Sequence, residues 1–199
     1  GDLAELYDTP IGSNYIAACQ DRSVADVPPL VKYMEECIGV PKDEYINSGV
    51  LLMNLKALRE KKFDEHFLNL LNTYHFESIA PDQDYINAIC NGKIHYLSEA
   101  WDTMPRDNAP ELVGAKIIHY NLFSKPWCYD NVQYGYLFWQ YAKDSGYYAE
   151  ALEHKALYSQ EKKDNDAACL KILIENGEKF CDNEITFKKM HDAGVKIRL

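Results

Sequence analysis

Apolar residues fall into two kinds of pattern along the chain. Tyr15–Cys19 and Val50–Met53 are continuous apolar runs of strand length, and the second is typical of a strand covered on both faces. Lys93–Leu97 and Lys116–His119 are predicted as two further strands. Between these runs, helical spacing predicts one helix whose buried stripe consists of Phe63, Phe67, Leu70, Leu71 and Tyr74.

Proline and glycine mark the ends of two more predicted helices. The first begins at Pro28, runs through Cys37 and ends before Gly39, a residue type favoured just past a helix end. The second begins at Pro81 and stops at Gly92. Its buried side is expected to consist of Ile86, Ile89 and Cys90.

Strands and helices alternate up to about Trp127, which predicts the α/β fold class. Beyond that point only helices are predicted, at Val132–Lys143, Tyr148–Tyr158 and Asp166–Asn176. We therefore expect an α/β body at residues 1–128 and a helical tail at residues 129–199.

Composition and charge narrow the class of protein. The 199 residues are 47% apolar and 26% charged, as in ordinary globular proteins, and no apolar run is long enough to cross a bilayer. A signal peptide is not expected either. The net charge of −10 argues against a nucleic-acid partner, which requires a basic surface. The last 50 residues hold 10 acidic and 9 basic side chains, so the acidity belongs to the body.

The cysteine pattern predicts free thiols. No Cys-x-x-Cys pair and no closely spaced histidine accompanies any cysteine, which argues against a zinc site. Free thiols are typical of a reducing compartment, so we expect a cytoplasmic location. The six residues are Cys19, Cys37, Cys90, Cys128, Cys169 and Cys181.

Three polar clusters follow predicted strands or open predicted helices. The first contains Asn47, Ser48 and Gly49, just before Val50–Met53. Its amide and hydroxyl groups suit a ligand's hydroxyls, and glycine permits close approach of the backbone. Asn-Ser-Gly is also common turn chemistry, and on the residues alone a turn is favoured.

The second cluster, Pro81–Asp84, places two carboxylates on either side of the Gln83 amide at a predicted helix start. These groups suit sugar hydroxyls or an electron-poor carbon. Asp82 also fits a simple helix N-cap, and Asp84 in the first turn suits the helix dipole. On the residues alone the cap is favoured.

The third cluster is the most specific. A predicted strand delivers His119, and Lys125 follows six residues later, next to Pro126 and Trp127. Imidazole is a good ligand for a divalent metal, and lysine offers a positive charge to phosphate. A lone histidine at a strand end is more often structural, but the whole segment predicts a diphosphate and metal site.

Three strings in this order resemble glycosyltransferase family 8: YINSGVLLMNL at Tyr45–Leu55, PDQDYIN at Pro81–Asn87 and HYNLFSKPW at His119–Trp127. Members of this family are retaining sugar-nucleotide transferases with the GT-A fold. The resemblance covers nearly the whole chain up to about Tyr148. It implies an incomplete GT-A domain followed by the helical tail.

The resemblance also implies a metal and diphosphate site. His119 would bind Mn²⁺, or Mg²⁺, together with the two aspartates of the family's Asp-x-Asp motif. Lys125 would contact the donor's diphosphate. The family often has glycine where this chain has Leu122, whose backbone amide would approach the same phosphates.

The donor-sugar site follows from the same resemblance. Asp21, Asn47 and Ser48 would line the sugar, and Asp82 would hold its hydroxyls. Gln83 would face the anomeric carbon on the side opposite to the departing UDP. Gln83 and Asp82 are therefore the expected catalytic pair.

The function implied is that of a Mn²⁺-dependent retaining hexosyltransferase. It would move glucose or galactose from UDP-glucose or UDP-galactose to a carbohydrate or glycolipid acceptor, in the cytoplasm and at the inner face of a membrane for lipid-linked acceptors. Only weak peripheral membrane contact is expected, because the tail is not clearly basic. The first residues, Gly1–Gly12, resemble the segment that follows the family's metal motif, so this chain alone is expected to be inactive.

Two alternatives belong to other functional classes. One is a non-catalytic sugar- or nucleotide-binding module, left by loss of the N-terminal half. The other is an interaction domain that uses the aromatic residues of the tail, namely Tyr129, Tyr134, Tyr136, Phe138, Trp139 and Tyr141. Such aromatics are more often core residues.

Overall fold

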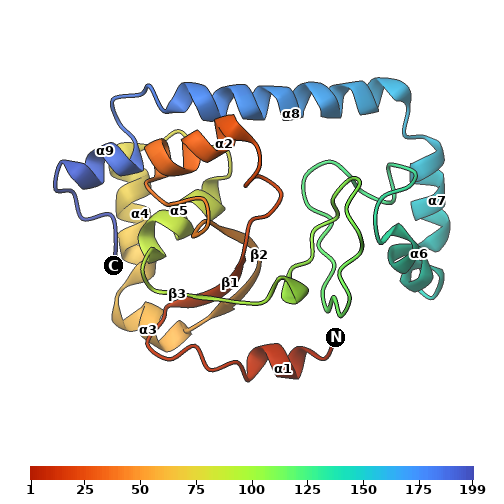
Figure 1. Ribbon diagram of the computed structural model, residues 1–199, viewed down its shortest axis with the longest axis horizontal. Coiled ribbons are helices and arrows are strands. Elements are labelled where there is room, and N and C mark those ends of the chain that lie inside the picture. Colours follow the sequence, from red (N-terminus) through yellow and green to blue (C-terminus); the bar gives the residue numbers. More distant parts are fainter.

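The computed structural model describes residues 1–199 and is built on a small mixed sheet (Figure 1). The central strand β1 (Ile16–Gln20) pairs antiparallel with β2 (Ile46–Met53) and parallel with β3 (Ile94–Tyr96). The sheet order is β2-β1-β3, so β1 is covered on both edges and four of its five residues are buried. Strands and helices alternate through this part of the chain, which confirms the predicted α/β class.

Helices pack on this sheet at the positions where proline and glycine punctuate the sequence. The helix α2 (Pro28–Lys32) continues as a π-helix (Tyr33–Ile38) and ends at Gly39, whose φ of 81° is left-handed. The other helices of the body are α1 (Leu3–Tyr7), α3 (Leu55–Glu60), α4 (Phe63–Tyr74), α5 (Pro81–Cys90) and a 3₁₀ turn at Glu99–Trp101.

The C-terminal part is helical, as predicted. It contains α6 (Gly135–Lys143), α7 (Tyr148–Ala156), α8 (Gln160–Phe180) and α9 (Phe187–Asp192). The long helix α8 runs along one side of the molecule, from α7 back to α2 and α9 (Figure 1). Its Gly177 lies so close to α2 that an added Cβ would be 3.1 Å from Leu30 Cδ2. None of the helices has the length and apolar character needed to span a membrane.

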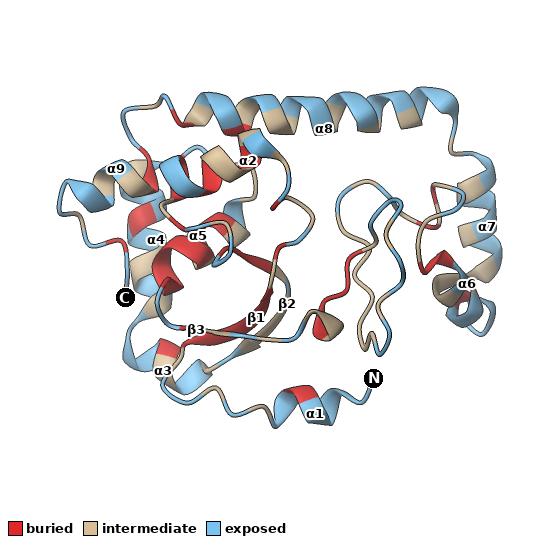
Figure 2. Ribbon diagram, viewed as in Figure 1, coloured by how far each residue is buried: buried red, intermediate tan, exposed pale blue.

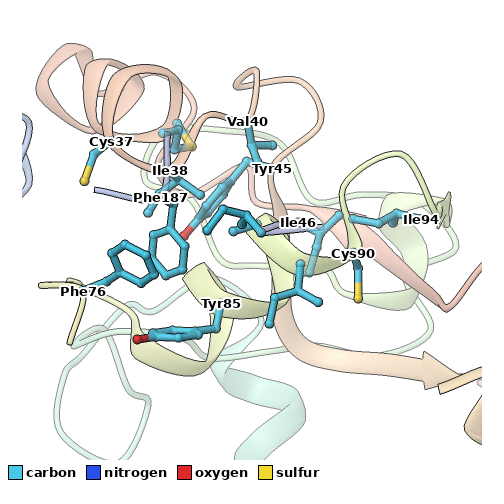
Figure 3. Close-up of a cluster of buried hydrophobic side chains, with 14 of the residues drawn as sticks. Cys37, Ile38, Val40, Tyr45, Ile46, Phe76, Tyr85, Cys90, Ile94 and Phe187 are labelled. Atoms are coloured by element: carbon cyan, nitrogen blue, oxygen red, sulfur yellow. The ribbon is translucent and has the colours of Figure 1, made fainter. Parts of the chain in front are cut away.

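The main core lies between α5, the π-helix and the sheet, where buried residues concentrate (Figure 2). Phe76 stacks on Phe187 with ring centroids 4.0 Å apart, and Tyr85 meets Phe187 edge-on at 4.8 Å (Figure 3). Phe187 belongs to α9, and Ile197 near the C-terminus is also buried. The last residues of the chain therefore complete the core of the body.

The structure corrects the prediction for the second strand. β2 begins at Ile46 rather than Val50, so Asn47, Ser48 and Gly49 lie inside a strand and not in a turn. The pairing shifts between Gln20–Ile46 and Ala18–Leu51, which leaves these polar residues in an irregular, bulged stretch. β2 is also an edge strand, and Val50–Met53 is half-buried to exposed rather than covered on both faces.

Other expectations need smaller corrections. Lys116–His119 makes backbone hydrogen bonds with residues 100–103 but forms only an isolated bridge, Thr103 with Ile118, because its neighbour is a 3₁₀ turn and not a strand. Leu71 is exposed on α4, although the rest of its stripe contacts the core. The predicted helix at Val132 begins three residues later.

Candidate functional site

A cavity of about 300 Å³ lies where β1 ends, and residues from all three polar clusters line it. Its polar wall includes Asn47 and Ser48 of β2, Gln83 of α5, and His119 and Lys125 of the loop at 119–127. The apolar wall comes mainly from Val24, Leu30, Tyr33, Met34, Ile79 and Leu173. The fold thus brings together segments that are separated by up to about 150 residues in the sequence.

Asp21 joins the first two clusters. It directly follows β1 and is only 4% exposed. Its Oδ2 accepts from Asn47 Nδ2 at 2.9 Å and from Gln83 Nε2 at 3.0 Å. Its Oδ1 accepts from the backbone and the hydroxyl of Ser23, at 3.0 and 2.5 Å. Four donors therefore hold this carboxylate in one orientation.

The orientation of both side-chain amides is fixed by their partners. Gln83 Oε1 accepts from the Ser48 backbone N–H at 3.0 Å while its Nε2 faces the Asp21 carboxylate. Asn47 Oδ1 accepts from the Gly49 backbone N–H at 2.8 Å and its Nδ2 also donates to Asp21. Because a backbone N–H only donates and an ionised carboxylate only accepts, neither amide can be flipped. The Gln83 oxygen therefore lies on the β2 side.

Asp82 does not cap α5, contrary to the expectation from the residues alone. The N-cap is Ala80, which makes no side-chain cap bond, and Pro81 occupies the first turn. Asp82 is exposed and accepts from the Ser48 hydroxyl at 2.8 Å. It lies outside the set of residues that line the cavity.

Asp84 binds two tyrosines of the cavity lining. It is fully buried and accepts from the hydroxyls of Tyr33, Tyr45 and Ser78, and from the Ala80 backbone N–H at 3.1 Å. Burial raises the pKa of this carboxyl above its usual value, although the three hydroxyl donors oppose the shift. Tyr33 and Tyr45 also line the cavity. Tyr45 opens the string YINSGVLLMNL, but the residues alone do not predict that its hydroxyl and that of Tyr33 bind Asp84.

Asn87 connects α5 to β2. Its Oδ1 accepts from the Ile46 backbone N–H at 2.8 Å, and its Nδ2 donates to the Ile46 and Gln83 carbonyls, both at 2.9 Å. Since the side chain is fully buried, these bonds fix the spacing between the strand and the helix. They thereby hold Gln83 opposite Ser48.

His119 is held from two sides. Its Nδ1 lies 3.0 Å from Oδ1 of Asp102, a fully buried carboxylate whose Oδ2 has no partner. On the other side, an added Cβ on Gly49 would lie 2.1 Å from His119 Cε1 and 2.5 Å from Nδ1. The ring therefore packs directly on the β2 backbone, and only glycine leaves room for it.

The histidine fits one place in a divalent metal site. Metal-binding imidazoles commonly have their second nitrogen bound to a carboxylate, as His119 does with Asp102. Mn²⁺ requires several oxygen or imidazole ligands, however, and no group of three or more His, Cys, Asp or Glu side chains in the structure is arranged to hold a metal. The residues of this chain alone do not form a complete metal site.

Lys125 faces the same cavity from the loop after His119. Its Nζ donates to the Tyr120 carbonyl and lies 5.9 Å from the Trp127 ring centroid. Burial lowers the pKa of the Lys125 ammonium below its usual value. Leu122 also lines the cavity and has a left-handed φ of 48°, the region that glycine enters without strain. The loop thus adopts here the backbone conformation that suits the glycine often found in the resembled family.

A sequence model described as glycosyl transferase family 8 matches residues 1–131, about two thirds of the chain. The chain belongs to glycosyltransferase family 8. This match includes all three polar clusters and confirms the resemblance stated from the sequence.

Relatives agree with this family assignment. The chain is 28% identical over 156 residues to the lipopolysaccharide 1,2-glucosyltransferase of Escherichia coli, covering 67% of this chain and 44% of that protein. It is 32% identical over 105 residues to a protein of Haemophilus influenzae, and the alignment covers 53% of this chain and 31% of that protein. The chain therefore spans about a third to a half of the length of the curated relatives it matches.

Solved structures confirm the fold. The galactosyltransferase LgtC, in complex with donor and acceptor sugar analogues, aligns with a TM-score of 0.61 at 26% identity, covering 73% of this chain and 57% of that one. The bifunctional glycosyltransferase WbbM aligns with a TM-score of 0.67 at 20% identity, and the alignment covers 78% of this chain and 32% of WbbM. The family 8 chain thus shares the GT-A fold and a helical C-terminal part with these neighbours.

Proposed function

We propose that this chain provides the donor-sugar and diphosphate side of the active site of a retaining hexosyltransferase. The enzyme would move glucose or galactose from a UDP-sugar to a saccharide or lipid-linked acceptor. The observation that carries the proposal is the convergence of Asn47, Gln83 and Lys125 on one cavity, with Asp21 joining the first two. A relative named as a glucosyltransferase and a structural neighbour named as a galactosyltransferase support it.

The charges around the cavity suit such a donor. Asp21, Asn47 and Ser48 offer carboxylate, amide and hydroxyl groups to a hexose, and Asp82 binds the Ser48 hydroxyl from outside the cavity lining. Lys125 and Leu122 line the same cavity, and Lys125 would supply a positive charge and the loop at Leu122 a backbone amide for the diphosphate. A fixed cation at the leaving group stabilises the charge that develops there during transfer.

Gln83 is proposed to act at the anomeric carbon. Its oxygen has one lone pair engaged by the Ser48 N–H and a second one available. An oxygen atom held in this way can stabilise the positive charge of an oxocarbenium-like centre. Asp82 would assist by binding the hydroxyls of the same sugar.

We also propose that the transferase depends on Mn²⁺, with Mg²⁺ as a substitute. His119 would contribute one ligand, and the two aspartates of the family's Asp-x-Asp motif would add the others. When bound, the cation would neutralise the diphosphate as UDP departs. The fully buried Asp102 behind His119 supports a cation at this position, because a buried carboxylate is stabilised by a nearby positive charge.

The proposed organisation has an α/β body at residues 1–128, which holds every polar side chain named for the donor, and a helical tail at residues 129–199. All six cysteines are free, as is typical of a reducing compartment. We therefore propose a cytoplasmic enzyme that works at the inner face of a membrane when its acceptor is lipid-linked.

The test is transfer of labelled hexose by the full-length protein from UDP-glucose and from UDP-galactose. We expect activity with Mn²⁺, loss with EDTA, and a fall in kcat of about 100-fold or more for His119→Ala and for Lys125→Ala. Lys61→Ala, which changes an exposed lysine outside the cavity, is the matched control. Unchanged activity in both variants, with and without EDTA, would contradict the proposal.

A non-catalytic sugar- or nucleotide-binding module is the second candidate. The observation that favours it is that no three His, Cys, Asp or Glu side chains of this chain are arranged to hold a metal. Calorimetry of the chain with UDP-glucose and UDP-galactose, with and without Mn²⁺, separates the two. Metal-independent binding, combined with no transfer by the full-length protein, would favour the module.

A further inference from the structure

Asp102 and His119 form a hydrogen-bonded pair that is separate from the network of Asp21, Asn47 and Gln83. Asp102 is fully buried after the 3₁₀ turn, and its only side-chain hydrogen bond is the 3.0 Å contact with His119 Nδ1. No lysine or arginine of the chain pairs with it, and its Oδ2 has no partner. A carboxylate buried with so few partners is costly, so its contact with His119 must be maintained.

This contact determines the protonation of the imidazole. A neutral imidazole carries its proton on one nitrogen, and the partner of each nitrogen decides which. An ionised carboxylate only accepts hydrogen bonds, so Nδ1 must be the protonated nitrogen. The lone pair then belongs to Nε2, the nitrogen left free on a ring that lines the cavity.

Gly49 restricts the ring from the opposite direction. An added Cβ would lie 2.1 Å from Cε1, so the imidazole edge rests on the β2 backbone with no space to turn toward it. The Gly49 N–H is itself bound to Asn47 Oδ1 at 2.8 Å. The strand that presses on His119 is therefore held by the same network as the donor pocket.

We infer that Asp102 is a positioning residue that fixes His119 as the Nδ1-protonated tautomer and, together with Gly49, presents Nε2 to the cavity. The use made of Nε2 rests on the proposed transferase function, but the tautomer itself does not. Asp102 does not line the cavity, and its side chain is connected to it through His119.

The test is NMR of the chain with ¹⁵N-labelled histidine, because a protonated ring nitrogen resonates well upfield of an unprotonated one. Free histidine titrates at about pH 6.5, so spectra are recorded at about pH 8. The signals of His119 are assigned by their loss in His119→Gln. We expect a protonated Nδ1 and an unprotonated Nε2 in the unchanged protein.

In Asp102→Ala we expect the preference for a protonated Nδ1 to be lost, with the proton shifting toward Nε2. In Asp102→Asn we expect this preference to be partly retained, because the amide oxygen can still accept from Nδ1. Asp107→Ala removes an exposed carboxylate from the same segment and should leave the spectrum unchanged. Thermal unfolding confirms that each variant is folded.

Two outcomes would overturn the inference: a protonated Nε2 in the unchanged protein, or the same Nδ1-protonated signal in a folded Asp102→Ala. The first needs no variant, so the inference stays testable if Asp102→Ala does not fold. Failure of hexose transfer with the tautomer as expected would overturn the proposed function alone.

Discussion

Gln83 Nε2 donates to Asp21 Oδ2 at 3.0 Å, although the two residues are 62 positions apart and belong to different layers of the fold. Asp21 follows the central strand, and Gln83 lies in the first turn of α5. The proposed reacting amide is thus anchored to the most buried strand of the sheet. Its position depends on the fold rather than on its own helix.

Asp21→Asn should loosen this anchor. The introduced NH₂ group would face either the donors of Ser23 or those of Asn47 and Gln83. A buried polar group left without a partner in this way costs about 1–3 kcal/mol. We expect the free energy of unfolding in urea to fall by about that amount, and UDP-sugar affinity to fall about tenfold or more. Asp26→Asn, at an exposed position nearby, is the control. Equal effects of the two substitutions would exclude the anchoring role.

Gly49→Ala should displace His119. The added methyl group would lie 2.1 Å from Cε1 and 2.9 Å from Asn47 Oδ1, so the ring must move. Overpacking of this kind costs about 1–3 kcal/mol of stability, and misplacing a catalytic group by about 1 Å can cost about 100-fold in turnover. Hexose transfer by the full-length protein measures the second effect.

The matched control is Gly146→Ala, where no atom lies within 4 Å of an added Cβ and φ is not left-handed. This variant should be as stable and active as the unchanged protein. If Gly49→Ala were as active as Gly146→Ala, displacement of the His119 ring would have no effect on hexose transfer, which would contradict the prediction.

Lys125→Arg should change the pH dependence of donor binding. Because burial lowers the Lys125 pKa from the usual 10.5, its charge is lost as the pH rises through a value below 10.5. We expect the KM for the UDP-sugar to rise in this alkaline range. Arginine stays charged to about pH 12, so the variant should give a flat profile. Parallel profiles for the two proteins would show that another group titrates.

Tyr45→Phe should destabilise the protein in a pH-dependent way. The Tyr45 hydroxyl donates to the buried Asp84, and a hydrogen bond to a charged group contributes about 1.5–3 kcal/mol. Burial raises the pKa of Asp84 above 3.8, its ordinary value. The favourable contribution of this shift to the free energy of unfolding is fully present below about pH 3.8 and is lost as the pH rises through the folded-state pKa. Loss of the hydroxyl raises that pKa further, so the deficit should be larger at pH 7 than at pH 4.

Urea unfolding at the two pH values measures this deficit. Tyr141→Phe removes a hydroxyl from a side chain that is largely exposed and should have little effect at either pH. A deficit in Tyr45→Phe that does not change with pH would mean that Asp84 keeps one charge state throughout.

The apolar pattern predicts β1 and β3 closely but places the start of β2 at Val50 rather than Ile46. β1 and β3 lie within one residue or so of the predicted runs because they pair with each other. Lys116–His119 has the same kind of pattern but lies next to a 3₁₀ turn, and a local pattern contains no information about its neighbour. Proline and glycine predicted the ends of the helix from Pro28 to Gly39 because their backbone preferences are local.

The sequence motifs of the site were predictable, but the hydrogen-bond partners of their residues were not. The three clusters could be located from residue types and order. Whether Asn47 lies in a turn or a strand, and whether Asp82 caps a helix or is available to a sugar, depends on partners elsewhere in the fold. Asp102 carried no signal, since the residue that explains it is 17 positions away. The contacts of Tyr33 and Tyr45 with Asp84 were not predicted for the same reason, since they span 51 and 39 positions.

The cavity wall includes Leu173 of α8, which lies well beyond residue 131, where the family match ends. Part of the apolar surface beside the polar groups is therefore encoded outside the segment that contains the motifs. Substitutions in α8 can reshape the apolar side while every motif residue stays the same. Two proteins with identical motifs could in this way accept substrates of different shape.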